Sequence, residues 1–158
     1  PNIAPEPSIM KALQDAIMVP ENYKYAINEL PEMKAAIHDW YKDRYHVELT
    51  NDEMICLQGS QEALSTLFLA MCDPGDIVLV PDPYYPIFSD GPKIAGAKVE
   101  YMPLLQENNY VIQLDKIDEE IAKKAKMMIV SYPNNPTCAI APDSFYEELI
   151  QFVKKYLT

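Results

Sequence analysis

The sequence predicts an α/β fold in which helices cover both faces of a mostly parallel β-sheet. Strands are predicted near residues 54–57, 77–80, 98–102 and 126–131, and the first two of these segments are short apolar runs. Segments with helical spacing of apolar residues alternate with them, near 60–72, 86–95, 115–123 and 143–156. Strands that alternate with helices in this way are typical of a parallel sheet, because each helix returns the chain to the edge where the previous strand began.

Two helices are expected before the first strand. Pro7 and Ser8 begin one of them, and Pro31 begins the other as a first-turn proline. Each helix carries an apolar stripe that we expect to be buried: Ile9, Leu13, Ala16 and Ile17 in the first, and Met33, Ile37, Trp40 and Tyr41 in the second.

Two of the later helices carry further signals. Ser144 and Glu147 have the spacing of a capping box, which would begin the last helix. Gly91 and Pro92 fall inside the helix expected at 86–95, where an interior proline costs about 3 kcal/mol or kinks the helix. We therefore expect this helix to be disturbed.

Charge and cysteine content exclude several classes of protein. The chain has 24 acidic and 13 basic residues and a formal net charge of −11, whereas nucleic acids and anionic membranes attract basic surfaces. Cys56, Cys72 and Cys138 are odd in number and widely spaced, so neither a disulfide framework nor a metal site is predicted. The sequence has no signal peptide pattern and no apolar run of about 18 residues, so we expect a cytoplasmic protein without a membrane partner.

Three polar turns follow predicted strands, where open parallel sheets place their ligands. The first is Gly59-Ser60-Gln61, a glycine turn leading into a helix, and such a helix start favours a bound anion through its free N–H groups and its dipole. The alternative is ordinary N-capping by Ser60 and Gln61. The chain has four glycines and neither GxGxxG nor GxxxxGK[ST], so dinucleotide and P-loop sites are not predicted.

The other two turns carry aromatic and amide side chains. Tyr84 and Tyr85 lie in a proline-braced loop, where a ring of fixed orientation either stacks on a planar ligand or covers the end of the sheet. Asn135 lies between Pro133 and Pro136 in a stiff turn, so its amide is either aimed at a ligand or has the usual role of Asn in turns. The three turns together predict a pocket for a phosphorylated aromatic ring.

These motifs resemble the pyridoxal-phosphate-dependent aminotransferases of fold type I, class I/II. Residues 132–137 are similar to the family's Asn-Pro-Thr-Gly signature, residues 73–76 to its common Asp-Pro-Gly-Asp turn, and residues 81–86 to its stacking loop. The resemblance implies that the cofactor phosphate is held by Gly59, Ser60 and Gln61. It also implies that Tyr85 stacks on the pyridine ring and that Asn135 hydrogen-bonds the ring 3′-oxygen.

The resemblance has consequences for assembly and domain organisation. Tyr25 is similar to the tyrosine that reaches the phosphate in the partner subunit, which implies a homo-oligomer, expected as a dimer. Residues 1–30 would form an N-terminal helix and arm, and residues 31–158 an incomplete pyridoxal-phosphate-binding large domain. Cys138 stands where the family signature has glycine.

The resemblance implies a fragment of an amino-acid aminotransferase, which uses pyridoxal 5′-phosphate to move an amino group from an amino acid to a 2-oxo acid. In the family the Schiff-base lysine, the aspartate at the pyridine nitrogen and the substrate arginine come later than Thr158, so the chain alone is expected to be inactive. A cut sheet would also expose an edge, which predicts self-association. Two alternatives stay open: a non-catalytic binding or assembly module, and a pyridoxal-phosphate-dependent lyase or synthase of the same fold.

Overall fold

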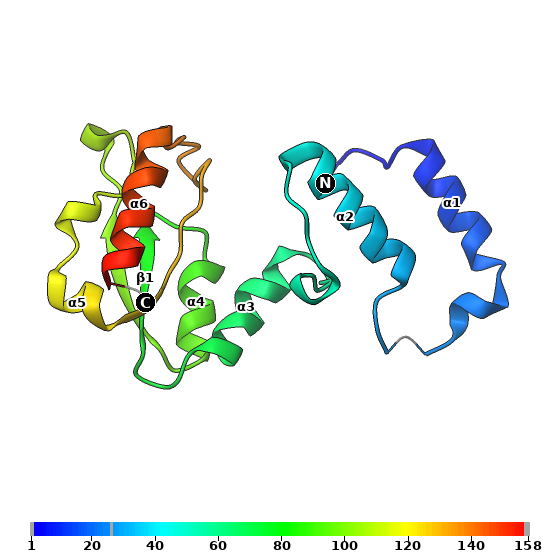
Figure 1. Ribbon diagram of the computed structural model, residues 1–158, viewed down its shortest axis with the longest axis horizontal. Coiled ribbons are helices and arrows are strands. Elements are labelled where there is room, and N and C mark those ends of the chain that lie inside the picture. Colours follow the sequence, from blue (N-terminus) through cyan, green and yellow to red (C-terminus); the bar gives the residue numbers. More distant parts are fainter. Residues whose placement is uncertain (1, 26, 157–158) are drawn as a thin grey trace. The chain divides into compact units, whose positions relative to one another are not determined.

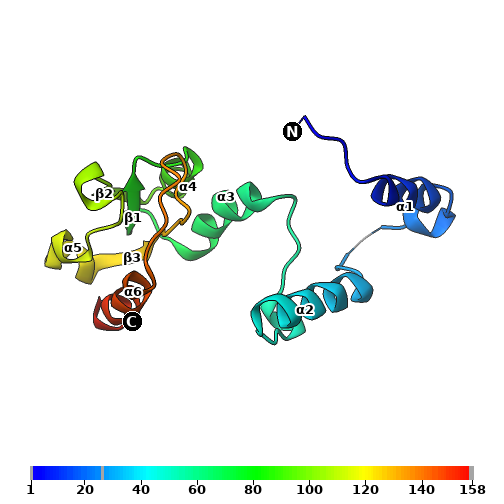
Figure 2. The ribbon, with the colours of Figure 1, turned by 90° about the horizontal axis from the view of Figure 1, so that it is seen from above.

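The computed structural model describes residues 2–25 and 27–156, and the chain divides into two compact units, residues 1–56 and 57–158. The C-terminal unit contains a three-stranded sheet in the order β2-β1-β3 (Figure 2). The strands are β1 (Ile77–Asp82), β2 (Lys98–Pro103) and β3 (Ala125–Met128), and both pairings are parallel. The predicted α/β fold with a parallel sheet is therefore confirmed.

Helices precede and connect the strands of this unit (Figure 1). They are α3 (Ser60–Met71) before β1, α4 (Ile87–Ile94) between β1 and β2, α5 (Glu119–Lys124) before β3, and α6 (Asp143–Tyr156) after it. Short 3-10 helices η3 (Gln106–Asn108) and η4 (Leu114–Lys116) lie between β2 and α5. α5 begins later than predicted, because the Asp118 carboxylate caps it by accepting from the N–H groups of Glu120 and Ile121 at 2.9 and 3.0 Å.

The central strand divides the core of this unit into two clusters, because alternate side chains of a strand point to opposite faces. Val78 and Val80 are fully buried on one face with Phe68 of α3 and Phe88 of α4. Leu79 lies on the other face, in a second cluster that also contains Met102, Leu104, Ile112, Ala125, Ala141 and Phe145. Figure 2 shows α4 and α6 on opposite sides of the sheet, as this division requires.

The Gly91-Pro92 pair in α4 has a packing role. Both residues are buried, and a Cβ added at Gly91 would lie 2.9 Å from the Phe68 Cδ2 atom and still closer to the Leu64 carbonyl oxygen of α3. Glycine therefore permits the close approach of α3 and α4. Pro92 lies inside the helix, which nevertheless continues to Ile94.

The strands differ in length from those predicted, and one proline explains part of the difference. β1 extends to Asp82, whose carbonyl oxygen accepts from the Leu104 N–H at 2.7 Å. β3 ends at Met128, although the Ile129 N–H still donates to the Leu79 carbonyl at 2.9 Å. The next bond of this parallel ladder would come from residue 81, and Pro81 has no N–H to donate.

The strand predicted at 54–57 is wrong, and so is the capping box at Ser144. Residues 54–57 belong to no strand; Met54 is extended (φ −127°, ψ 134°), and the Cys56 N–H donates instead to the Glu29 carboxylate at 3.0 Å. An apolar run becomes a strand only where a partner strand pairs with it. α6 begins at Asp143, which places Ser144 inside the first turn and not at the N-cap.

The N-terminal unit contains α1 (Pro7–Ile17) and α2 (Pro31–Tyr45), which begin at the predicted prolines, and the 3-10 helices η1 (Pro20–Tyr23) and η2 (Asn51–Glu53). The prediction that their apolar stripes are buried is wrong, since Leu13 is 64% and Trp40 55% exposed. α1 contacts the short η1 turn, where the Tyr23 hydroxyl donates to the Ile17 carbonyl at 2.9 Å, and this turn is too small to cover the stripe. Within the residues described, no helix combines the length and apolarity that crossing a bilayer requires.

Candidate functional site

The first element of the site is the start of α3. Gly59 is its N-cap, with φ 84° and ψ 158°, a conformation that residues with a side chain rarely adopt. No atom lies within 4 Å of the position that a Cβ would occupy there, so the need for glycine is conformational and not steric. Ser60 and Gln61 follow in the first turn, where backbone N–H groups have no intrahelical acceptor and the helix dipole is positive.

A carboxylate organises the turn before this helix. Glu62 lies in the first turn, and its Oε2 atom accepts a hydrogen bond from the Gln58 N–H at 2.6 Å. The Gln58 N–H therefore has an acceptor. The N–H groups of Ser60 and Gln61 have none among the described residues, so they are available to a ligand at the helix start.

The second element is the loop between β1 and α4, and the structure joins it to the first. The Gln61 side-chain amide donates to the Tyr85 hydroxyl. The Tyr85 ring is half-buried and packs edge-on against Phe88, with ring centroids 6.0 Å apart and an interplanar angle of 80°. Two predicted site residues from separate segments are thus in contact, and the aromatic ring has a fixed support.

Tyr84 is held by a cluster that sequence reasoning missed. Its ring stacks on Tyr101 of β2, with centroids 5.5 Å apart and planes 14° from parallel. The Tyr101 hydroxyl lies 3.0 Å from Ser89 Oγ, 3.4 Å from the Tyr84 hydroxyl and 3.3 Å from Lys93 Nζ, and these three groups lower the pKa of Tyr101. The loop that carries Tyr85 is thereby fastened to the neighbouring strand. No local signal marks this role, because the four residues meet only through the tertiary fold.

The third element is the loop after β3. Asn134 is buried, its N–H donates to the Ala139 carbonyl and its Nδ2 atom to Thr137 Oγ1, each at 2.9 Å. The exposed neighbour Asn135 forms no side-chain hydrogen bond within the described part of the chain. The loop is therefore closed by Asn134, and the Asn135 amide is left uncommitted; no hydrogen bond joins it to Gln61 or Tyr85 among the described residues.

Two further residues, Tyr132 and Cys138, make contacts that hold this loop in place. The Tyr132 hydroxyl accepts from the Ile112 N–H at 2.8 Å, and its ring packs edge-on against Phe145 at 5.4 Å. Burial raises the pKa of Tyr132, so the hydroxyl stays protonated. Cys138 has φ 58°, the left-handed region that favours glycine, and its N–H donates to the Asn134 carbonyl at 2.6 Å.

The sixth predicted residue, Tyr25, belongs to the N-terminal unit. It is 94% exposed and borders a groove of about 820 Å³ lined also by Leu13, Ile17 and Leu30. The other five predicted residues all belong to the C-terminal unit.

The donors and surfaces of the C-terminal unit suit a ligand with an anionic group and a planar ring. Free N–H groups and the Ser60 hydroxyl offer hydrogen bonds to the anion, the supported Tyr85 ring offers a flat face, and the Asn135 amide offers a donor or an acceptor. These groups fit a phosphorylated pyridine cofactor.

Comparisons with known proteins point to one family. A sequence model described as "Aminotransferase class I and II" matches residues 2–158. The LL-diaminopimelate aminotransferases of Halothermothrix orenii and Aquifex aeolicus are each 44% identical, over 94% and 96% of this chain. The solved structure of BacF from Bacillus subtilis matches with a TM-score of 0.92 and 36% identity over 99% of this chain. The chain spans only 39% to 40% of the length of these proteins.

Proposed function

This chain belongs to the class I and II aminotransferase family, and we propose that it is the N-terminal portion of a pyridoxal-phosphate-dependent aminotransferase. The observation that carries the proposal is the contact between Gln61 at the helix start and Tyr85 in the β1–α4 loop. This contact joins a helix start whose free N–H groups suit an anion to an aromatic surface, the two features that one phosphorylated ring needs. The substrates would be an amino acid and a 2-oxo acid, and because the relatives are LL-diaminopimelate aminotransferases, a diaminopimelate-like amino acid is the first to assay.

Each site residue has a proposed role in holding the cofactor. Gly59, Ser60 and Gln61 bind the phosphate through backbone N–H groups and the Ser60 hydroxyl. Tyr85 lies against one face of the ring, and Asn135 donates a hydrogen bond to the ring 3′-oxygen. Pyridoxal phosphate, when bound, supplies the electron sink for amino-group transfer, and these residues fix its orientation.

The proposal extends to the assembly of the intact enzyme. Tyr25 is proposed to reach the phosphate of a partner subunit in a homodimer, which its 94% exposure permits. Residues 1–30 are proposed as an N-terminal helix and arm and residues 31–158 as part of the cofactor-binding domain, in a cytoplasmic enzyme. The present chain alone is expected to bind the cofactor weakly and to transfer no amino groups.

Pyridoxine 5′-phosphate provides a clean test, because it keeps the ring and the phosphate but lacks the aldehyde that reacts with lysines. We expect its titration to shift the backbone amide signals of residues 59–62 and the ring signals of Tyr85 in NMR spectra. Pyridoxine without phosphate should shift them less, and Gln61→Ala should weaken the response. Ser65→Ala is the matched control, since Ser65 lies further along α3 and its hydroxyl donates to the Glu62 carbonyl at 2.9 Å. Shifts confined to other residues, or an equal response to both compounds, would count against the proposal.

A further inference from the structure

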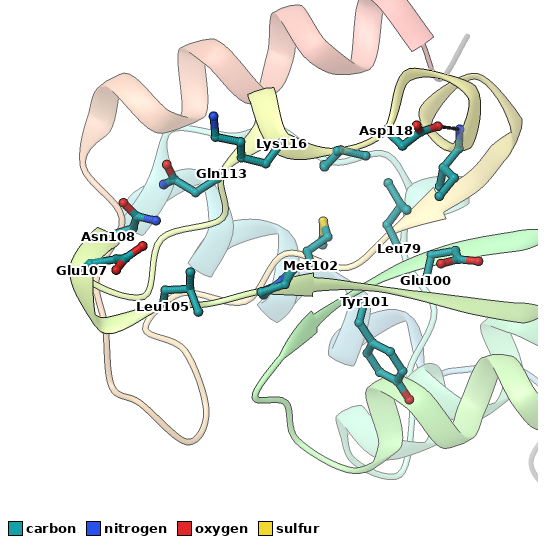
Figure 3. Close-up of a pocket in the computed structure, with 13 residues that line it drawn as sticks. Leu79, Glu100, Tyr101, Met102, Leu105, Glu107, Asn108, Gln113, Lys116 and Asp118 are labelled. Atoms are coloured by element: carbon teal, nitrogen blue, oxygen red, sulfur yellow. Dashed lines mark hydrogen bonds between the residues drawn. The ribbon is translucent and has the colours of Figure 1, made fainter.

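A separate cavity lies beside strand β2. It has a volume of about 460 Å³ and lies between β2 and the segment 113–121 (Figure 3). Apolar side chains from the sheet and from the segment 113–121 line the cavity: Leu79, Met102, Leu105, Ile117 and Ile121. None of the six residues proposed to bind the cofactor lines it. The volume is within the range of small-molecule sites, about 300–1,000 Å³.

An acidic side chain faces this apolar cavity. Along β2, Glu100 and Met102 lie on the cavity side, whereas the Tyr101 ring points away toward the opposite face of the sheet (Figure 3). Glu100 is half-buried and lies opposite Leu79 in the strand register. In the part of the chain described, its carboxylate has no hydrogen bond and no ion pair. This carboxylate is therefore available to pair with a cation that enters the cavity.

The other charged groups of the cavity make it net acidic. Glu107 and Asp118 also line it, and Asp118 accepts the two N–H bonds that cap α5. Lys116 is the one basic residue in the described lining, and it forms a 3.4 Å ion pair with Asp115 in which both side chains are largely exposed. Three carboxylates therefore line the cavity, those of Glu107 and Asp118 on exposed residues, against a single ammonium group that is already paired.

We propose that this cavity binds a small organic cation with an apolar body, such as an alkyl- or arylammonium ion. The ammonium group would lie against the Glu100 carboxylate, and the apolar body would cover Leu79, Met102 and Ile121. The negative charge of the lining should make the affinity for this cation higher than that for an anion of the same shape. The apolar lining should make it higher than that for an inorganic cation. This site goes beyond the proposed aminotransferase function and does not depend on it.

Glu100 has one competing physical role. A charge that points inward on an edge strand opposes pairing with the edge of another molecule. Under that role Glu100→Gln would increase self-association and leave ligand binding unchanged, so the two roles have different signatures.

The experiment compares three ligands of one size: n-hexylammonium, n-hexanol and hexanoate. Titrations are followed through the methyl NMR signals of Met102, Ile117 and Ile121. We expect all three signals to shift with hexylammonium, with an affinity about three- to five-fold above that for hexanol, as for a partly exposed ion pair. Hexanoate should bind most weakly.

Two variants of equal net charge complete the design. Glu100→Gln should lower the hexylammonium affinity about three- to five-fold and leave the hexanol affinity unchanged. Glu147→Gln, on the exposed surface of α6, should change neither. Equal affinities of the wild-type chain for hexylammonium and hexanoate would overturn the proposal. Unchanged hexylammonium binding in Glu100→Gln, with or without increased association in sedimentation velocity, would overturn it as well.

Discussion

Replacement of Gly91 by alanine tests the close packing of α3 on α4. Helix propensity alone favours alanine by about 1 kcal/mol, and Gly91 has no positive φ that would oppose a side chain. The added Cβ, however, would lie 2.9 and 3.1 Å from two ring carbons of Phe68, closer than ordinary contact, and closer still to the Leu64 carbonyl oxygen. A backbone carbonyl cannot rotate away, so the helices must separate.

The size of the effect follows from these contacts. Overpacking of a core costs about 1–3 kcal/mol, and contact with a backbone atom places Gly91→Ala at the upper end. Because the higher helix propensity of alanine offsets about 1 kcal/mol of this cost, we expect Gly91→Ala to lower the free energy of unfolding by about 2 kcal/mol. This corresponds to about 30-fold faster hydrogen exchange at amides that exchange through unfolding of the C-terminal unit.

Native-state hydrogen exchange at Val78, Leu79 and Val80 is the appropriate assay, because these buried β1 residues report on the C-terminal unit alone. Gly75→Ala is the control: Gly75 has φ 97° but no atom within 4 Å of an added Cβ, so its cost is purely conformational, about 1 kcal/mol. Protection in Gly91→Ala equal to or above that of the wild-type chain would refute the packing argument.

Three further predictions concern single side chains. Cys138→Gly should stabilise the C-terminal unit by about 1 kcal/mol in urea unfolding, because it relieves a left-handed backbone at φ 58°; a loss of stability would contradict this. Tyr132→Phe should cost about 1–2 kcal/mol in the same assay, because the buried Ile112 N–H loses its acceptor; an unchanged midpoint would show that another acceptor replaces it. Two hydrogen bonds from Thr50 lower the pKa of Glu53, so the stabilisation they give is present above the ordinary carboxyl pKa and is lost as pH falls through the lowered value. Thr50→Ala should therefore raise the Glu53 pKa in a carbon-13 carboxyl titration, and an identical titration curve would show that the bond from the Thr50 hydroxyl has no effect on Glu53.

Local signals predicted some elements well. Proline at the first helical position predicted the starts of α1 and α2 at Pro7 and Pro31, since its fixed φ suits that position. Cys138 stands where the family signature has glycine, and its φ of 58° lies in the left-handed region that favours glycine. The hydrophobic run at 77–80 predicted β1 because a central parallel strand is buried on both faces, and the predicted β2 and β3 were also confirmed.

Features that depend on distant partners could not be predicted. The run at 54–57 has the composition of a strand, but pairing depends on a neighbour that its own residues do not specify. The contacts of Gln61 with Tyr85 and of Tyr84 with Tyr101 join segments 24 and 17 residues apart, and no local pattern encodes them. The sequence predicted that the Asn135 amide points toward a ligand. It did not predict that Asn134 closes the same loop, because nothing in the sequence distinguishes two adjacent asparagines.

Pro81 limits the pairing of a segment nearly fifty positions later in the chain, after β3. By withholding one hydrogen-bond donor, it releases the carbonyl of Ile129 from the ladder and lets the chain turn toward the loop that carries Asn135. A residue with an N–H at position 81 would allow the β1–β3 ladder to continue and would bring the rigid part of the chain closer to that loop. The point at which the chain leaves the sheet for the Asn135 loop thus depends in part on a residue outside that loop, and a substitution at position 81 would change the loop without contacting it.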